Sequence, residues 1–187
     1  MVLITLSEIL KLFIMTIVLG IIFMGLFSRK PKTIYHMMKR KRFNWDDLWF
    51  AIMISAPAIV LHELAHKFMA MGFGYSASFE IFPLGLGLGL LLRLLNSPFL
   101  IIAPGYVTIS QAAAASEWVY RLIAFAGPLT NLVIWFVAFM MVRTRKHKMS
   151  HSALNFWLLT RNINLVLFIF NMIPFGPLDG AKVFFGP

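Results

Sequence analysis

Four apolar stretches of this 187-residue chain are each long enough to cross a membrane as a helix, and they limit what the chain can fold into. Of all residues, 60% are hydrophobic and only 13% are charged. A soluble domain of this size could not bury so much apolar surface. The sequence therefore predicts an integral, multi-pass membrane protein. The expected spans are residues 1–28, 46–72, 116–142 and 152–174.

Local signals mark the ends of these helices. Asn44 is a candidate N-cap of the second helix, and Asp46 follows it near the positive end of the helix dipole. Ser116 is a candidate N-cap of the third helix, and Pro174 ends the fourth. We interpret the first stretch as a retained span, because it carries Glu8 in its first turns and has no small-residue cleavage site.

The basic residues are concentrated in two blocks beside the apolar stretches. The net charge of +10 is compatible with nucleic-acid binding, but 11 of the 17 basic residues lie in these blocks. Next to spans, such blocks set the topology and contact anionic headgroups. We therefore expect the lipid bilayer as a partner and no nucleic acid. The first block, in an expected basic loop of residues 29–45, comprises Arg29, Lys30, Lys32, Lys39, Arg40, Lys41 and Arg42; the second comprises Arg143, Arg145, Lys146 and Lys148.

Residues 73–115, between the second and third spans, have a different pattern. FPLGLGLGLLLRLL (82–95) alternates glycine and leucine, and FLIIAPGYVTIS (99–110) is rich in β-branched residues. A phosphate-binding loop is disfavoured, because no lysine or serine follows in the P-loop pattern. The alternatives are a sheet or a re-entrant element at membrane depth, whose backbone other protein or water must cover. The period-two pattern favours the sheet.

The last segment, residues 175–187, contains LDG, where a new helix is expected to begin at Leu178 or Asp179. This segment is too short to span a membrane, so a longer chain that continues beyond Pro187 is one alternative. The predicted fold is one domain, residues 1–187. It is an all-α polytopic membrane protein with at least four transmembrane helices, a small β element between the second and third, and the start of a further helix.

The second span contains HELAH (62–66), the HExxH pattern of zinc hydrolases. His62 and His66 are four positions apart, so on a helix both imidazoles can reach one metal ion. Glu63 lies on the neighbouring face, close to any water on that metal. The alternative is two buried, hydrogen-bonded histidines with an incidental glutamate. In a membrane, the desolvation of all three groups would cost free energy that no interaction offsets, so we favour a metal site.

Two histidines leave a catalytic zinc site incomplete, because such sites usually have three protein ligands and one open position. The other histidines lie in or beside the basic blocks, where a solvated role is expected: His36, His147 and His151. Asp179 lies in NMIPFGPLDG, after the fourth span. The second and fourth helices both start beside a basic block, so their far ends share one side of the membrane. That places Asp179 towards the level of His62 and His66. The alternative role for Asp179 is the N-cap of the final helix.

Three motifs occur together in the chain: HELAH (62–66), GPLTN (127–131) and NMIPFGPLDG (171–180). From about residue 45 onward, this combination resembles the site-2 protease family of intramembrane zinc metalloproteases. PGYV (104–107) resembles the membrane-embedded strand region of that family. The glycine-leucine stretch after HELAHKFMAMGFGYSASFE looks most like archaeal members without a PDZ domain, which implies the cell membrane of an archaeon.

The resemblance implies a zinc-dependent endopeptidase that cuts a membrane protein within or near a transmembrane segment. It implies that His62, His66 and Asp179 bind Zn²⁺ and that Glu63 is the catalytic acid/base. Asn131, Asn171 and Gly105 would line the site. For Asn131 and Asn171, the alternative role is hydrogen bonding between helices. Asn162 and Asn164 could likewise line a path for water or form hydrogen bonds between helices. The rival functions are a membrane metal transporter or metal-binding protein, and an inactive protease-like protein that binds membrane helices.

An extended substrate is required, because a helical peptide bond is masked by its own hydrogen bonds. The glycine-leucine and PGYV stretches are candidates for an edge to which a substrate strand adds. For orientation, positive-inside reasoning places both basic blocks in the cytoplasm. The resemblance implies the reverse, with the N-terminus and the metal site towards the cytoplasm, and we adopt that orientation as the hypothesis.

Overall fold

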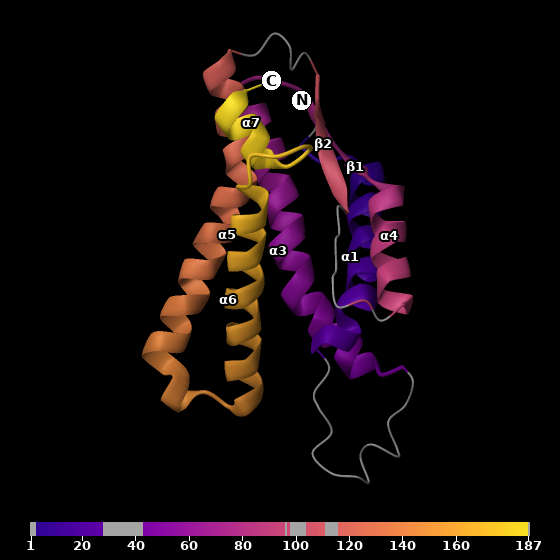
Figure 1. Cartoon of the computed structure of the whole chain (residues 1–187), viewed down its shortest axis with the longest axis vertical. Helices are drawn as coiled ribbons and strands as arrows, with labels where there is room; N and C mark the ends of the chain where they lie inside the picture. Colours follow the sequence, from indigo (N-terminus) through magenta and orange to yellow (C-terminus); the bar gives the residue numbers. More distant parts are fainter. Residues whose placement is uncertain (1–2, 28–42, 96, 98–103, 111–115, 187) are drawn as a thin grey trace.

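The computed structural model describes residues 3–27, 43–95, 97, 104–110 and 116–186 (Figure 1). Four helices in it are long and apolar enough to cross a membrane, which confirms the predicted all-α polytopic class with a small β element. The elements in chain order are α1 (Leu6–Phe27), α3 (Trp45–Gly72), β1 (Ala77–Ile81), α4 (Pro83–Leu94), β2 (Gly105–Ile109), α5 (Glu117–Arg145), η2 (Lys146–Lys148), α6 (His151–Asn171) and α7 (Asp179–Phe185).

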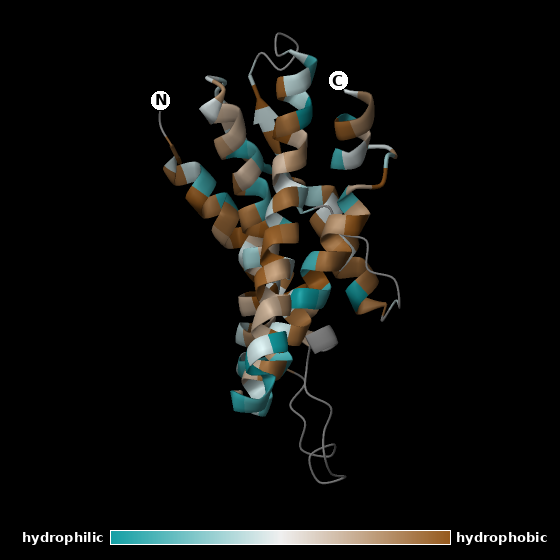
Figure 2. Ribbon diagram, turned by 90° about the vertical axis from the view of Figure 1, so that its left-hand side faces the viewer, coloured by the Kyte–Doolittle hydropathy of each residue, from teal (hydrophilic) through white to brown (hydrophobic). Residues whose placement is uncertain are grey.

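Helix α3 is the centre of the bundle. It packs on α1 on one side and on α5 on the other, and α6 packs on α5 (Figure 1). Large apolar side chains point outward from the long helices: Phe13 of α1 is 61% exposed and Val166 of α6 is 63% exposed. Hydrophilic residues gather where α5 ends and η2 begins (Figure 2). This distribution is the one expected for helices that face lipid along their length and water at their ends.

Of the two predicted N-cap residues, one caps its helix with its side chain and the other does not. The side chain of Asn44 accepts a hydrogen bond from the backbone N–H of Asp46 at 3.1 Å, which confirms the predicted N-cap of α3. Ser116 occupies the N-cap position of α5, but its side chain makes no capping hydrogen bond. The first basic block lies outside the described residues. The second block ends α5 and forms η2, and its side chains are exposed.

The prediction that the glycine-leucine stretch forms a strand is wrong, because Pro83–Leu94 is helix α4. Gly85, Leu86 and Gly89 are its buried residues. Two glycines four positions apart fall on one face of a helix, and Leu86 from that face joins the core with Met15 of α1. Leu84, Leu88, Leu91 and Leu94 are exposed, whereas Leu90 and Leu92 are half-buried. The period-two pattern thus also satisfies a helix with one small-residue face, and Pro83 at its start favours that helix.

The sheet has two antiparallel strands, β1 and β2, with Phe79 opposite Val107 and Ile81 opposite Gly105. The strand predicted in FLIIAPGYVTIS is confirmed over Gly105–Ile109. Packing is tight at Gly105, where a Cβ would fall 2.6 Å from the Phe79 ring and 2.8 Å from the Glu80 carbonyl oxygen. Glycine is therefore required there for the sheet to close around Phe79.

A first prediction concerns the crossing of α1 and α3. A Cβ at Gly20 would lie 3.1 Å from Leu48 Cδ1 and closer still to Ile52 Cγ1. We expect Gly20→Ala to lower the free energy of unfolding by about 1–3 kcal/mol, because overpacking separates the two helices. Unfolding of the detergent-solubilised chain measures this. Gly87→Ala is the matched control, since nothing lies within 4 Å of its Cβ position. Equal losses in both variants would contradict the packing account.

Candidate metal centre

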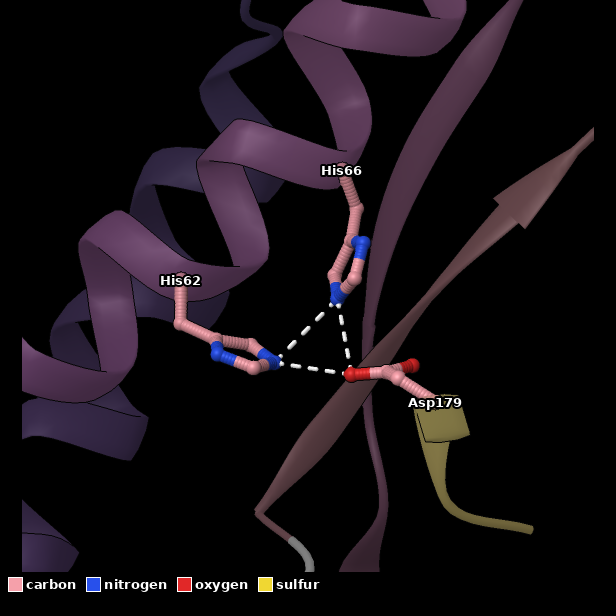
Figure 3. Close-up of side chains that lie close together, drawn as sticks. All are labelled: His62, His66 and Asp179. Carbon is pink, nitrogen blue, oxygen red and sulfur yellow. Dashed lines mark hydrogen bonds and ion pairs between the residues drawn. The ribbon is translucent and has the colours of Figure 1, made fainter. Parts of the chain in front are cut away.

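Three atoms able to bind a metal converge from two elements more than 100 residues apart (Figure 3). Asp179 Oδ2 lies 3.1 Å from His62 Nε2 and 3.2 Å from His66 Nε2. The two Nε2 atoms are 3.1 Å apart. The exposed fractions of these side chains are 8% for His62, 10% for His66 and 13% for Asp179. The structure thus brings together the three residues selected from the sequence as ligand candidates.

The position of Asp179 depends on the glycine that follows it. A Cβ at Gly180 would fall 2.5 Å from the carbonyl oxygen of Met172 and 2.6 Å from that of Ile173. Only glycine therefore lets α7 approach the end of α6 so closely. Leu178, not Asp179, occupies the N-cap position of α7. The alternative role of Asp179 as a helix cap is therefore wrong, and its side chain is directed at the two histidines (Figure 3).

A polar network fixes the ring of His62. Its Nδ1 lies 2.6 Å from Asn131 Oδ1. The Asn131 amide donates its two protons to the Ala58 carbonyl at 2.8 Å and to Asn164 Oδ1 at 2.9 Å. Since both amide protons are used, Asn131 Oδ1 is an acceptor, and the proton on His62 must be at Nδ1. Asn131 and Asn164 are fully buried, as groups in such a network are expected to be.

A hydrogen bond at Nδ1 also fixes the ring of His66. Its Nδ1 lies 2.7 Å from the carbonyl oxygen of Ile123, which can only accept a hydrogen bond. Both histidines therefore carry their proton at Nδ1 and present Nε2 towards Asp179. Histidine ligands of metals typically have this arrangement, in which the second ring nitrogen donates to a carbonyl or carboxylate.

The donor set fits a zinc ion. With their protons at Nδ1, the two Nε2 lone pairs face each other and a carboxylate oxygen at 3.1–3.2 Å, and only a cation or extra protons can relieve the repulsion. Tetrahedral zinc with nitrogen and oxygen ligands at about 2.0–2.1 Å separates them by roughly 3.3 Å. Space beside the ligands is kept by Gly127, where a Cβ would fall 2.6 Å from His62 Nε2 and closer still to His66 Nε2. Fe(II) and Co(II) would fit the same ligands.

The ionisation of Asp179 suits a metal ligand. Burial raises the pKa of its carboxyl, but hydrogen bonds and charge interactions with His62 and His66 outweigh burial and hold the pKa well below its usual range. The carboxylate is therefore ionised.

Glu63 lies beside this group without belonging to it. Its side chain is buried on α3, and its carboxyl interacts electrostatically with His62, Asp179 and Lys182. This places a carboxylate next to the ligands while leaving the ligand set at two imidazoles and one carboxylate.

The remaining site candidates have different positions. Asn131 contacts His62, as described above. Asn171 is the last residue of α6 and Gly105 is in β2; within the described part of the chain, neither is hydrogen-bonded to the three ligand candidates. Their place in the site stays a prediction. The backbone carbonyl of Ile123 was not identified from the sequence, because a main-chain acceptor leaves no signal in residue identity.

Comparison with known proteins agrees with this chemistry. The chain is 36% identical over 144 residues to "Putative zinc metalloprotease MJ0611" of Methanocaldococcus jannaschii, which covers 75% of this chain and 72% of that protein. It is 28% identical over 150 residues to "Putative zinc metalloprotease YwhC" of Bacillus subtilis, which covers 72% of this chain and 67% of that protein. No protein-family model and no solved structure matches.

A second prediction tests the network around His62. Asn131→Ala removes the acceptor that fixes the ring, so zinc affinity should fall about 10–100-fold, as measured by competition with a chromogenic chelator. Asn131→Asp keeps an oxygen towards Nδ1 and should lose less. Asn162→Ala, at an exposed position of α6, is the control and should bind zinc like the parent. An unchanged affinity of Asn131→Ala would show that the network does not support the ligand.

Proposed function

The chain belongs to the protein family of MJ0611, and from this premise we propose that it is a zinc-dependent endopeptidase acting on a membrane protein. Its proposed cleavage site lies within or near a transmembrane segment of that protein. The observation that carries the proposal is the convergence of Asp179 of α7 with His62 and His66 of α3, beside Glu63. Helix α3 is apolar and long enough to span a membrane. Intramembrane proteolysis of the site-2 protease type is the activity that such a location favours.

In this proposal, His62, His66 and Asp179 would hold the ion, and Asn131 with the Ile123 carbonyl keeps both imidazoles oriented. A zinc ion bound there would supply a Lewis acid that activates water and polarises the scissile carbonyl. Glu63 accepts the proton of the attacking water at its carboxylate and delivers it to the nitrogen of the leaving amine. The ligand side chains are only 8–13% exposed, and this burial strengthens each of these electrostatic interactions.

The free edge of the sheet is evidence for a substrate that binds in an extended conformation. Phe82 N–H donates to the Pro104 carbonyl and Ser110 N–H donates to the Ser76 carbonyl, so ladder bonds fall on alternate pairs. Val107 lies in a pair between them, and its N–H and C=O point away from β1. Among the described residues no hydrogen bond reaches them. β2 lies on the side of β1 that faces α7 in Figure 1. We propose that the substrate pairs with this edge of β2.

The rival functions fit less well. A transporter is expected to place metal ligands along a pore, whereas in the described residues one compact group of three has ligand spacing. An inactive protein that binds membrane helices has no chemical need for a buried carboxylate at Glu63, which is costly at membrane depth. The next experiment tests the transporter by metal flux, and a parent that cleaves no membrane substrate would favour the inactive protein.

A third prediction concerns Glu63. Glu63→Gln should retain zinc and lose cleavage of a reconstituted membrane substrate by about 10²–10⁴-fold, because the proton acceptor is removed while the ligands stay. Metal content by mass spectrometry and cleavage by gel assay measure the two effects. Asp46→Asn, an exposed change in the first turn of α3, is the control. Unchanged cleavage by Glu63→Gln would refute the assignment, and metal flux unaffected by Glu63→Gln would favour the transporter.

A fourth prediction concerns the edge of β2. Val107→Pro removes the outward N–H but no ladder bond, since proline is tolerated on an edge strand at such a position. We expect KM to rise about 3- to 10-fold, the effect of one lost hydrogen bond, with zinc content unchanged. Val107→Thr keeps the N–H and is the control. If both variants have the parental KM, the substrate does not pair there.

A further inference from the structure

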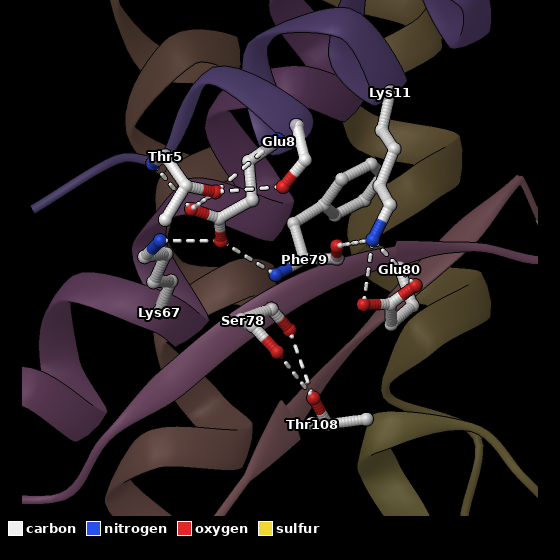
Figure 4. Close-up of polar contacts among 9 residues, drawn as sticks. Thr5, Glu8, Lys11, Lys67, Ser78, Phe79, Glu80 and Thr108 are labelled. Carbon is white, nitrogen blue, oxygen red and sulfur yellow. Dashed lines mark hydrogen bonds and ion pairs between the residues drawn. The ribbon is translucent and has the colours of Figure 1, made fainter. Parts of the chain in front are cut away.

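A second pair of charged side chains is buried outside the metal centre (Figure 4). Lys67 of α3 donates a hydrogen bond to Glu8 of α1, and the exposed fractions of the two side chains are 2% and 3%. Lys67 directly follows His66. Two buried charges cost more desolvation than two apolar side chains of similar volume, so packing alone does not explain the pair.

The two oxygens of Glu8 make separate sets of bonds. Oε2 accepts from the backbone N–H of Thr5 at 2.8 Å and from its hydroxyl at 3.0 Å. The Thr5 hydroxyl accepts in turn from Glu8 N–H at 3.3 Å, which completes a capping box at the start of α1. Oε1 accepts from Lys67 and, at 2.8 Å, from the backbone N–H of Phe79. The capping box accounts for Oε2 and leaves the bonds of Oε1 unexplained.

These bonds place α1 along the outer edge of β1. Phe79 lies in a pair between ladder bonds, so its N–H and C=O point away from β2. Glu8 accepts a hydrogen bond from the Phe79 N–H. Lys11 donates to the Phe79 C=O at 3.5 Å and forms an ion pair with the Glu80 carboxylate at 2.7 Å. Both outward groups of Phe79 are therefore occupied by side chains of α1 (Figure 4).

This arrangement links the sheet to the helix of the metal ligands. Through Oε1, a single atom of Glu8 holds the backbone of β1 and the residue next to His66. The Phe79 side chain is 1% exposed and packs with Met15 of α1 and Ile59 of α3, so the strand is held from both its backbone and its side chain. With the edge of β1 closed by α1, the edge of β2 is left for an incoming strand.

We propose that Glu8 is a positioning residue for peptide cleavage, whose Oε1 sets the open edge of β2 at a fixed place relative to the metal centre. The inference rests on the proposed endopeptidase function. It assigns Glu8 no contact with the reacting atoms. Its loss should therefore weaken substrate binding and leave the chemical step and the metal intact.

The test compares two double variants of the full chain that remove the charge pair in different ways. Glu8→Gln with Lys67→Met keeps an oxygen for the Phe79 N–H, whereas Glu8→Met with Lys67→Met removes it. Thr5→Val is the control for the capping box. Hydrogen–deuterium exchange of the β1 segment, zinc content, KM and kcat are measured for each.

We expect the Met/Met variant to exchange the Phe79 amide at least tenfold faster than the Gln/Met variant. Its KM should be about tenfold higher, at the upper end of the effect of one lost hydrogen bond, because the whole edge is displaced. Its kcat and zinc content should match those of the Gln/Met variant, and Thr5→Val should have the parental KM. Lys11→Met, at a partly exposed position, provides a second variant and should raise KM about 2- to 3-fold, as expected for one weak bond.

Equal KM values in the two double variants and the parental KM in Lys11→Met would overturn the role of Glu8. Equal exchange in the two double variants would show that Glu8 does not hold β1, and would overturn it as well. A parent that binds zinc but cleaves no membrane substrate would instead overturn the proposed function, and the inference with it. The experiment therefore distinguishes failure of the proposed role of Glu8 from failure of the proposed endopeptidase function.

Discussion

Polar side chains in apolar helices need partners, and this requirement determines how the helices of this protein pack. Lipid chains are as apolar as leucine, so burying leucine against another helix gains little in a membrane. Close contacts at small residues and hydrogen bonds between helices supply the specificity instead. Gly20 lets α1 approach α3, and Gly127 lets α5 approach the imidazoles of α3. The pair of Glu8 and Lys67 joins α1 to α3 at a buried position where neither charge could remain alone.

The candidate metal centre follows from the same requirement. From His62 a chain of hydrogen bonds runs through Asn131 of α5 to Asn164 of α6, and Asn164 donates to the Thr160 carbonyl at 2.8 Å. The side chains of Asn131 and Asn164 have hydrogen-bond partners on this path, whereas the Thr160 hydroxyl has none among the described residues. The two Nε2 atoms face each other and Asp179. The buried network thus orients the ligands and leaves one place where a cation completes the bonding.

The sequence predicted the features that depend on local pattern, namely the spans, the Asn44 cap, the HExxH face and the strand after Pro104. It failed for α4, because alternation of glycine and leucine satisfies both a strand and a helix with a glycine face, and packing on α1 decides between them. It treated Asn162 and Asn164 as equivalent, although the turn of α6 buries only Asn164. Asp179 could be selected by its motif, but its distance from the histidines depends on the close approach at Gly180, a tertiary contact.

Zinc K-edge X-ray absorption on the zinc-loaded chain tests the central claim, which is that α3 and α7 together form a metal centre. The account predicts four nitrogen or oxygen ligands at about 2.0–2.1 Å, with the multiple scattering of two imidazole rings. It also predicts that this scattering falls to that of one ring in His66→Ala. A shell of six oxygens without imidazole scattering, or a spectrum unchanged by His66→Ala, would contradict it.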